Sequence, residues 1–121
     1  MANAINWFEL PSNNFQRAVK FYGKVLNADL QPVDMPGPKM AFFPTSDNGV
    51  GGCVIHGEGY TPSMEGSLVY LNGGDDLSVP LSRVEEAGGE VLVPKMAIGE
   101  HGHIAIFKDT EGNRVAFHSL N

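Results

Sequence analysis

The chain has 121 residues, 42% of them hydrophobic, which suffices for one domain with its own core. Eight basic residues against fourteen acidic ones, without any Lys/Arg cluster, argue against a nucleic-acid partner, because phosphate binding depends on such charges. No apolar run approaches the roughly 20 residues of a membrane span, and the first residues do not resemble a signal peptide. We therefore expect no membrane partner and a cytoplasmic location.

Residues 5–10 are expected to form the first strand. Side-chain alternation places Phe8 and Leu10 on one face of this strand and Trp7 and Glu9 on the other. Both faces therefore carry large apolar side chains. This pattern suits a sheet that is covered by a helix on one side and borders a partly closed cavity on the other.

Turn residues at 11–14 predict the start of an amphipathic helix that ends near residues 27–28. Its apolar stripe consists of Phe15, Ala18, Val19, Tyr22, Val25 and Leu26. Three short strands should follow, separated by Gly/Pro and Asn-Gly turn signals. Their expected ranges are 29–35, 40–44 and 50–57.

The breaker-rich segment 58–66 is the expected linker, after which the pattern restarts with a strand at 67–71. A helix should follow and end at the glycines 88–89. Its apolar stripe consists of Leu77, Leu81, Val84 and Gly88. The last three strands are expected at 90–94, 103–108 and 113–119.

Both halves thus contain a strand, a helix and three strands, and each ends on an apolar–apolar–His run, at residues 53–56 and 115–118. A duplication in so short a chain means that neither half can bury a core alone. We predict an α+β fold in which two βαβββ modules form a cupped mixed sheet around a central cavity. The modules are expected at 4–57 and 67–119 of a single domain.

Three short motifs accompany this element order. Phe21-Tyr22 stands near the end of the first helix, Glu-Glu-Ala-Gly-Gly (85–89) ends the second, and residues 107–113 read Phe-Lys-Asp-Thr-Glu-Gly-Asn. With these motifs the whole chain resembles the vicinal oxygen chelate superfamily, which includes glyoxalase I, bleomycin-resistance proteins and extradiol dioxygenases. Residues 6–11 are similar to a branch described as predicted glyoxalase-related proteins. The resemblance implies the glyoxalase/bleomycin-resistance/dioxygenase fold.

The resemblance also implies where a metal would bind. Metal-dependent relatives take His or Glu ligands from the first and last strand of each half. The matching positions here are Trp7, Val54, Leu68 and Ala116, none of which coordinates a metal. We therefore expect no metal at the usual positions, no cofactor other than a displaced divalent transition metal, and no direct transfer of the glyoxalase I mechanism.

Two residues further along these strands, Glu9, His56, Tyr70 and His118 are expected on the same face. Glu9 and the two histidines are ligand types that suit iron, zinc or manganese, so one hypothesis is a displaced metal site. A second hypothesis places them as hydrogen-bonded polar groups at the mouth of the cavity. The third is acid–base catalysis by Glu9 or His118 without a metal.

Other candidates carry two interpretations each. Arg114 alternates onto the face of His118 and could meet a substrate carboxylate, or else ends a strand in solvent. His101 and His103 have a spacing that could chelate a metal, or else belong to a polar loop. Cys53 is expected as a buried strand residue rather than a catalytic thiol. Core or pocket walls are expected for Met35, Met40, Phe42 and Met96.

These residues are compatible with two functions. One is an enzyme, lyase-like or dioxygenase-like, that acts on a small oxygenated metabolite with Glu9 and His118 as proton-transfer groups. The other is a metal-free protein that binds or sequesters a small molecule, as bleomycin-resistance proteins do. In either case the substrate pocket is expected to contain Trp7, Phe42, His56, Tyr70 and Arg114. Open sheet edges and apolar faces further predict a homodimer.

Overall fold

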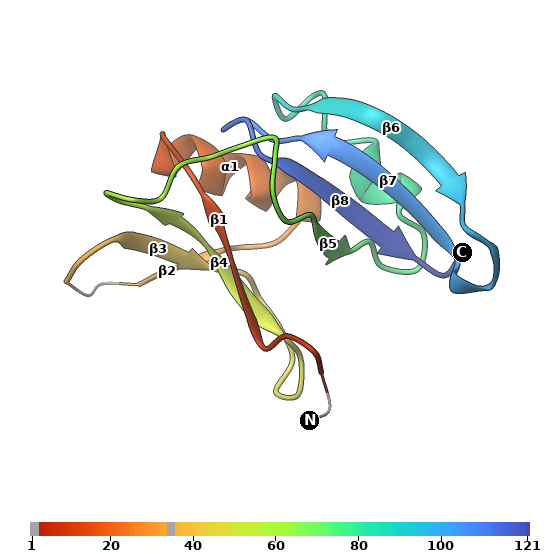
Figure 1. The fold of residues 1–121 in the computed structure, drawn as a ribbon, viewed down its shortest axis with the longest axis horizontal. Coiled ribbons are helices and arrows are strands. Elements are labelled where there is room, and N and C mark those ends of the chain that lie inside the picture. Colours follow the sequence, from red (N-terminus) through yellow and green to blue (C-terminus); the bar gives the residue numbers. More distant parts are fainter. Residues whose placement is uncertain (1–2, 34–35) are drawn as a thin grey trace.

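The computed structural model describes residues 3–33 and 36–121. Its strands form two four-stranded sheets, which meet near the single long helix (Figure 1). The first module consists of β1 (Trp7–Pro11), α1 (Phe15–Leu26), β2 (Gln31–Val33), β3 (Lys39–Phe42) and β4 (Gly51–His56). The second module consists of β5 (Val69–Asn72), α2 (Ser78–Leu81), β6 (Glu90–Ala97), the 3-10 helix η1 (Gly99–His101), β7 (His103–Lys108) and β8 (Arg114–Ser119).

The two modules have the same sheet topology. The strand orders are β1-β4-β3-β2 and β5-β8-β7-β6, with one parallel pair and two antiparallel pairs in each sheet. The duplicated βαβββ pattern and the α+β class are therefore confirmed. In both sheets the first and last strands of the module are parallel neighbours, which leaves β1 and β5 at sheet edges.

Helix α1 begins and ends where its sequence predicts. The Asn14 side chain accepts a hydrogen bond from the backbone N–H of Arg17 at 3.1 Å, which caps the amino end. Asn27 closes the carboxyl end in the left-handed conformation with φ 51°. The helix buries Ala18, Tyr22 and Val25 of the predicted stripe, and also Phe21, which was not part of it.

The second helix is shorter than its apolar stripe suggests. Only Ser78–Leu81 is α-helical, and after it three-residue and four-residue spacings mix, with the N–H of Val84 donating to the Leu81 carbonyl at 3.2 Å and that of Ala87 to Arg83 at 3.0 Å. Leu77 and Val84 are nonetheless fully buried. The stripe thus predicted packing correctly, but turns rather than helix continue to Gly88.

Several strand boundaries also differ from expectation, most clearly those of β2 and β6. The strand expected at 29–35 is confined to Gln31–Val33 within the described residues, and Met35 lies outside them. Strand β6 extends to Ala97, three residues beyond the predicted end. Register shifts along its pairing with β7 let this edge strand continue past Pro94.

One apolar core joins the two modules. Side chains from α1, from the helix-facing sides of both sheets and from Leu77 and Val84 belong to a single buried cluster. Phe21 of α1 lies 6.1 Å from Phe107 of β7, centroid to centroid. The helix α1 is therefore the element through which the second sheet packs against the first.

The turn between β7 and β8 reinforces this packing with two carboxylates. Asp109 accepts hydrogen bonds from the Tyr22 hydroxyl at 2.6 Å and from the backbone N–H groups of Glu111 and Asn113 at 2.8 and 2.9 Å. Because Tyr22 is buried, burial first and the Asp109 charge second raise the pKa of its hydroxyl well above its ordinary value. The Tyr22 side chain therefore stays a neutral donor.

Glu111 binds the start of α1. Its buried carboxylate accepts from the backbone N–H groups of Asn13 and Asn14 at 2.8 and 2.7 Å and from Arg17 Nε at 2.7 Å. Burial alone would raise the pKa of Glu111, but these bonds and one from Thr110 outweigh it and lower the pKa. The second module thus supplies an anion to the amino end of the first module's helix, where an anion is most stable.

Candidate functional site

Each sheet has one face toward the helices and one away from them, which we call the open face. In the first module, Trp7 and Glu9 lie on the open face and pair in register with Gly51 and Cys53 of β4. In the second module, Tyr70 and Asn72 lie on the open face and pair with Ala116 and His118 of β8. The alternation predicted for β1 is therefore confirmed.

His56 does not share the open face with Glu9. It alternates with Val54, which packs in the core against α1, and His56 Nδ1 lies 2.8 Å from the Ser12 carbonyl. The reason is a one-residue error in matching the two His-ended strands. The N–H of Ser12 donates to the Ile55 carbonyl, and the N–H of Gly73 donates to the His118 carbonyl. Ile55, not His56, is therefore the structural equivalent of His118.

The same correction changes the expected metal positions. Because Ile55 matches His118, Cys53 matches Ala116. Cys53, and not Val54, therefore occupies the second of the four positions that correspond to metal ligands in relatives. Cys53 is buried, and burial together with the charge of Glu9 raises the pKa of its thiol to about 12. At neutral pH it is a neutral thiol and thus a poor ligand and nucleophile, because both roles need the thiolate. The buried strand cysteine predicted from the sequence is thus confirmed.

The donor residues do not fit the metal that the resemblance implies. Among residues 3–33 and 36–121, no three or more His, Cys, Asp or Glu side chains come together in a group that could hold a metal ion. The displaced set of Glu9, His56 and His118 is not assembled, since His56 lies on the helix side of its sheet. We therefore derive no chemical step through a metal.

An aromatic pair occupies the open face of the first module. The Trp7 and Phe42 rings meet edge to face with centroids 5.1 Å apart, and Trp7 Nε1 donates to Glu9 at 3.3 Å. The indole lies across Gly51, where a Cβ atom would stand 3.1 Å from its ring. Gly52, on the helix side, similarly makes room for the Phe8 ring. The glycine pair of β4 therefore serves close packing.

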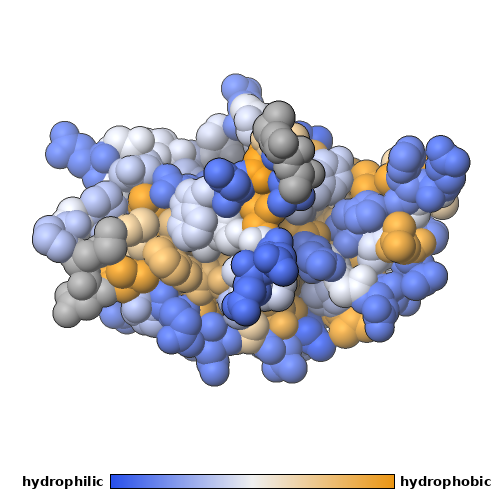
Figure 2. Space-filling model, turned by 90° about the horizontal axis from the view of Figure 1, so that it is seen from below, coloured by the Kyte–Doolittle hydropathy of each residue, from blue (hydrophilic) through white to orange (hydrophobic). Residues whose placement is uncertain are grey.

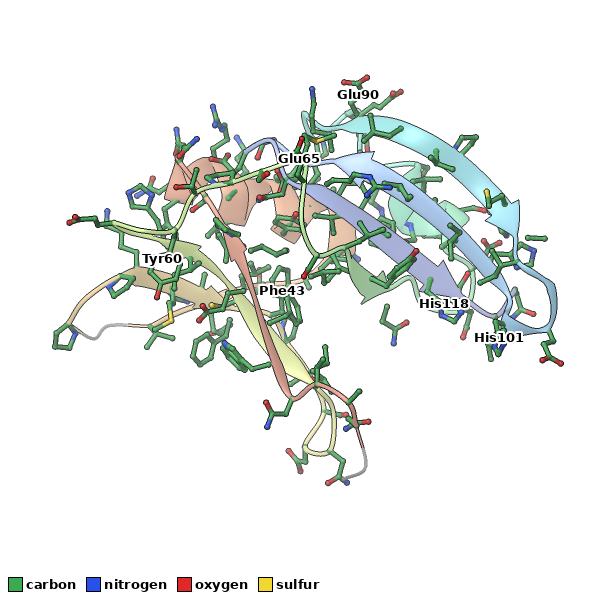
Figure 3. All side chains as sticks on the ribbon, viewed as in Figure 1. Phe43, Tyr60, Glu65, Glu90, His101 and His118 are labelled. Atoms are coloured by element: carbon green, nitrogen blue, oxygen red, sulfur yellow. The ribbon has the colours of Figure 1, made fainter. Side chains whose placement is uncertain are left out.

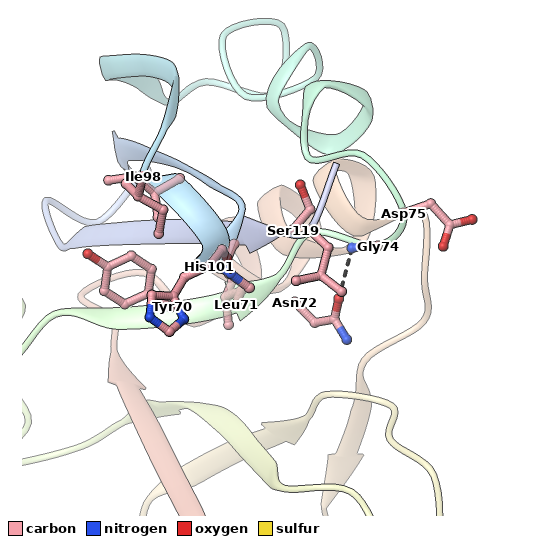
Figure 4. A pocket seen from close by; sticks show the side chains of 11 residues that line it. Tyr70, Leu71, Asn72, Gly74, Asp75, Ile98, His101 and Ser119 are labelled. Atoms are coloured by element: carbon pink, nitrogen blue, oxygen red, sulfur yellow. Dashed lines mark hydrogen bonds between the residues drawn. The ribbon is translucent and has the colours of Figure 1, made fainter.

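A pocket of about 860 Å³ opens on the second module (Figure 4). Its described lining comes from β5, the segment after it, the 98–104 region and the end of β8. These residues are Tyr70, Leu71, Asn72, Gly74, Asp75, Ile98, His101, Ile104, His118, Ser119 and Leu120. No described residue of the first module lines it.

This pocket is therefore not the cavity that was expected between the modules. Of the residues proposed for catalysis or for the substrate pocket, Tyr70 and His118 line it, and His101, the candidate chelator, lines it as well. The candidates outside it are Trp7, Glu9, Phe42, His56 and Arg114. Arg114 is exposed at the start of β8, opposite Lys108.

His118 is held by the loop that closes the pocket. Its Nε2 atom lies 2.6 Å from the backbone carbonyl of His101, and both residues stand close together at the far end of the second sheet (Figure 3). Because a carbonyl oxygen only accepts, Nε2 must carry a proton. Gly102 allows the loop to approach, since a Cβ there would meet the Ser119 carbonyl.

The His101–His103 pair does not form a chelate. The His101 side chain is largely exposed, while His103 pairs with Ser119 and has a buried Nδ1 atom without a hydrogen-bond partner in the described residues. The role of His101 in the pocket lies instead in its backbone carbonyl. Such a contact could not be predicted, because a backbone carbonyl leaves no residue-type signal in the sequence.

Several apolar lining residues were also absent from the sequence-based candidates. Ile98 and Ile104 lie on either side of η1, and Leu120 follows the last strand. The alternation of Ile104 with Ala105 in β7 could have placed Ile104 on the open face. Nothing in the sequence marks Ile98 or Leu120, because their positions depend on how the loop and terminus fold over the sheet.

One family model matches almost the whole chain. The family model described as Glyoxalase/Bleomycin resistance protein/Dioxygenase superfamily matches residues 4–117. No curated protein matches the chain. No helix in the described residues is long and apolar enough to cross a membrane.

Solved structures share the fold at low sequence identity. A glyoxalase/bleomycin resistance protein from Albidiferax ferrireducens has a TM-score of 0.77 and 13% identity, over 98% of this chain and 100% of that one. A glyoxalase-related enzyme from Fulvimarina pelagi has a TM-score of 0.67 and 16% identity, over 95% and 86%. An E144Q mutant of glyoxalase I from Zea mays has a TM-score of 0.72 and 15% identity. The match spans 94% of this chain but only 44% of the maize chain.

Proposed function

The chain belongs to the glyoxalase/bleomycin resistance protein/dioxygenase superfamily, and on this premise we propose that it binds a small, mostly apolar molecule in the pocket of its second module. The supporting observation is the pocket itself, which joins aliphatic and aromatic walls to a few polar groups. Ile98, Ile104 and Leu120 supply apolar surface, while Tyr70 and His118 supply polar atoms. Pockets of this composition and size are typical of small-molecule sites.

A pocket-filling substitution tests this proposal. Ile98→Trp should block the pocket, whereas Leu92→Trp, on the neighbouring strand β6, should not; both residues are similarly exposed, at 37% and 36%. A small-fragment library titrated into isotope-labelled protein should shift the amide signals of Tyr70 and His118. These shifts should disappear in Ile98→Trp and persist in Leu92→Trp. Fragments that shift other regions only would overturn the proposal.

Catalysis is the second candidate, and the observation that favours it is the fixed imidazole of His118. A neutral imidazole with one nitrogen held by a carbonyl is a suitable proton acceptor. Glu9, the other proposed proton-transfer group, lies on the first sheet and does not line this pocket. Since the metal positions lack ligands, we expect no turnover of the methylglyoxal–glutathione adduct typical of glyoxalase I, and robust turnover would contradict this.

We also propose that the chain forms a homodimer. Large apolar side chains outside the pocket are exposed on both modules, among them Trp7 at 42% and Met96 at 47%. The surface in Figure 2 accordingly shows apolar patches among hydrophilic residues. Pairing of two copies would cover such surface and the free edges of the sheets. Light scattering at micromolar concentration should give twice the monomer mass of 13.0 kDa, and the monomer mass would refute the dimer.

A further inference from the structure

The polar groups of the pocket specify the kind of ligand that fits it. Asn72 and His118 are register partners on adjacent parallel strands, so their side chains lie next to each other on the open face. Both line the pocket. The atoms of these two side chains that remain free for a ligand therefore contribute to what the pocket recognises.

One atom of each side chain is already bound within the protein. His118 Nε2 donates to the His101 carbonyl, so the neutral imidazole carries its lone pair on Nδ1. Asn72 Oδ1 accepts from the N–H of Gly74 at 2.8 Å, which leaves the Asn72 Nδ2 amide group as a donor. The neighbouring Ser119 hydroxyl accepts from Leu77 and donates to the Asn121 carbonyl. These two side chains therefore offer a ligand one acceptor beside one donor, at a pocket that the Tyr70 hydroxyl also lines.

The charges at the pocket also favour a ligand without a negative charge. Among its described lining residues there is no Lys or Arg, and Asp75 is acidic. The chain as a whole carries a formal net charge of −6. An anionic group would thus meet a negative environment, and it would also leave the His118 lone pair without a donor.

From this arrangement we infer that the pocket recognises a neutral hydroxyl group on an apolar molecule, that is, an alcohol rather than a carboxylate, ether or ketone. The hydroxyl donates to His118 Nδ1 and accepts from Asn72 Nδ2, while Ile98, Ile104 and Leu120 contact the hydrocarbon. The η1 loop is a positioning element, because its His101 carbonyl selects the tautomer of His118. This inference rests on the proposed function and narrows its ligand class.

Three probes of one hydrocarbon shape test the inference at pH 8, where imidazole side chains are ordinarily neutral. They are cyclohexanol, cyclohexyl methyl ether and cyclohexanecarboxylate, each titrated while the amide signals of Tyr70 and His118 are followed. Cyclohexanol should bind about fivefold more tightly than the ether, as expected for one additional hydrogen bond. The carboxylate should bind more weakly than the alcohol.

Two variants assign the preference to the imidazole. His118→Phe keeps a ring but removes Nδ1, so alcohol and ether should bind equally. His56→Phe makes the same change in the first module, at a residue that does not line the pocket, so the alcohol preference should persist. Ring-nitrogen chemical shifts of the free protein give an independent readout, and they should show the proton of His118 on Nε2.

The outcomes separate this inference from the proposed function. Absence of any probe-induced shift at the pocket, with the Nε2 tautomer intact, would argue against the pocket as a ligand site. Equal binding of alcohol and ether, or tighter binding of the carboxylate, would leave the pocket as a site and overturn the hydroxyl assignment. A proton on Nδ1 of His118 would also overturn it.

Discussion

The two modules share one topology but use their open faces differently. In the first module a large side chain from β1 covers part of the open face, because Gly51 lets the Trp7 indole lie across β4 against Phe42. In the second module the position that matches Gly51 is Arg114, and Tyr70 on β5 faces the small Ala116. The open face of the first module thus carries an edge-to-face aromatic pair, whereas that of the second module borders a pocket. Two modules of the same topology can therefore present different surfaces, because different side chains occupy matching strand positions.

The largest effect is expected when the Glu111 hydrogen bonds between the second module and α1 of the first are removed. Glu111→Ala should destabilise the protein by about 2 to 3 kcal/mol, because backbone N–H groups of Asn13 and Asn14 and the Arg17 guanidinium lose their buried acceptor. Urea unfolding followed by circular dichroism measures the change. Glu85→Ala is the matched control, since Glu85 is exposed and should alter stability by less than about 0.5 kcal/mol. Equal effects of both variants would contradict the role of Glu111.

The glycines of β4 provide the next test. Gly52→Ala should cost about 2 kcal/mol, because its Cβ would overlap the Phe8 ring, which packs against the core. Gly51→Ala should cost less, since the nearest Trp7 atom is 3.1 Å away and the indole is partly exposed, but it should shift the Trp7 fluorescence. Thermal unfolding and emission spectra together distinguish the two sites. A harmless Gly52→Ala would show that the first module does not depend on this close packing.

Acidification should weaken the contact between the modules. The pKa of Glu111 is lower in the folded protein than its ordinary value of 4.5, so its contribution to stability is complete above that value and decreases as the pH falls toward the folded pKa. Urea midpoints measured from pH 6 to pH 3 should therefore decrease. In Glu111→Gln the decrease should be smaller. The same pH dependence in both proteins would assign it to other groups.

The smallest expected effect concerns Cys53, at the position that Ala116 occupies in the second module. Its thiol is buried and has a pKa of about 12, so the folded protein should not react with a disulfide reagent at pH 8. The unfolded protein should react with one equivalent, because Cys53 is the single cysteine. Rapid reaction of the folded protein would show that the open face of the first module is accessible at β4.

Most of the fold was predictable because periodicity and turn residues act locally. The alternation in β1, the caps at Asn14 and Asn27 and the duplicated element order each depend on neighbouring residues alone. Register is not local. The two His-ended strands look equivalent in sequence, yet backbone bonds align Ile55 with His118, and this one-residue shift moves His56 to the other face.

The candidate site was predictable only in part, because much of it depends on contacts between residues that are distant in the sequence. Tyr70 and His118 follow from strand alternation, and both line the pocket. The remaining pocket features depend on tertiary contacts, such as the approach of the His101 carbonyl and the position of Leu120. The role of Gly51 likewise depends on a tertiary contact. The indole of Trp7, on the neighbouring strand, lies where a side chain at position 51 would stand.

The bonds from Glu111 to the start of α1 have a consequence for biosynthesis. They join residues up to 98 positions apart, so they cannot form until the turn that carries Glu111 has left the ribosome. Until then Phe21 and Tyr22 lack Phe107 and Asp109 as packing and hydrogen-bond partners. Until then part of the helix of the first module stays uncovered, and the later β7–β8 hairpin completes the packing of both modules.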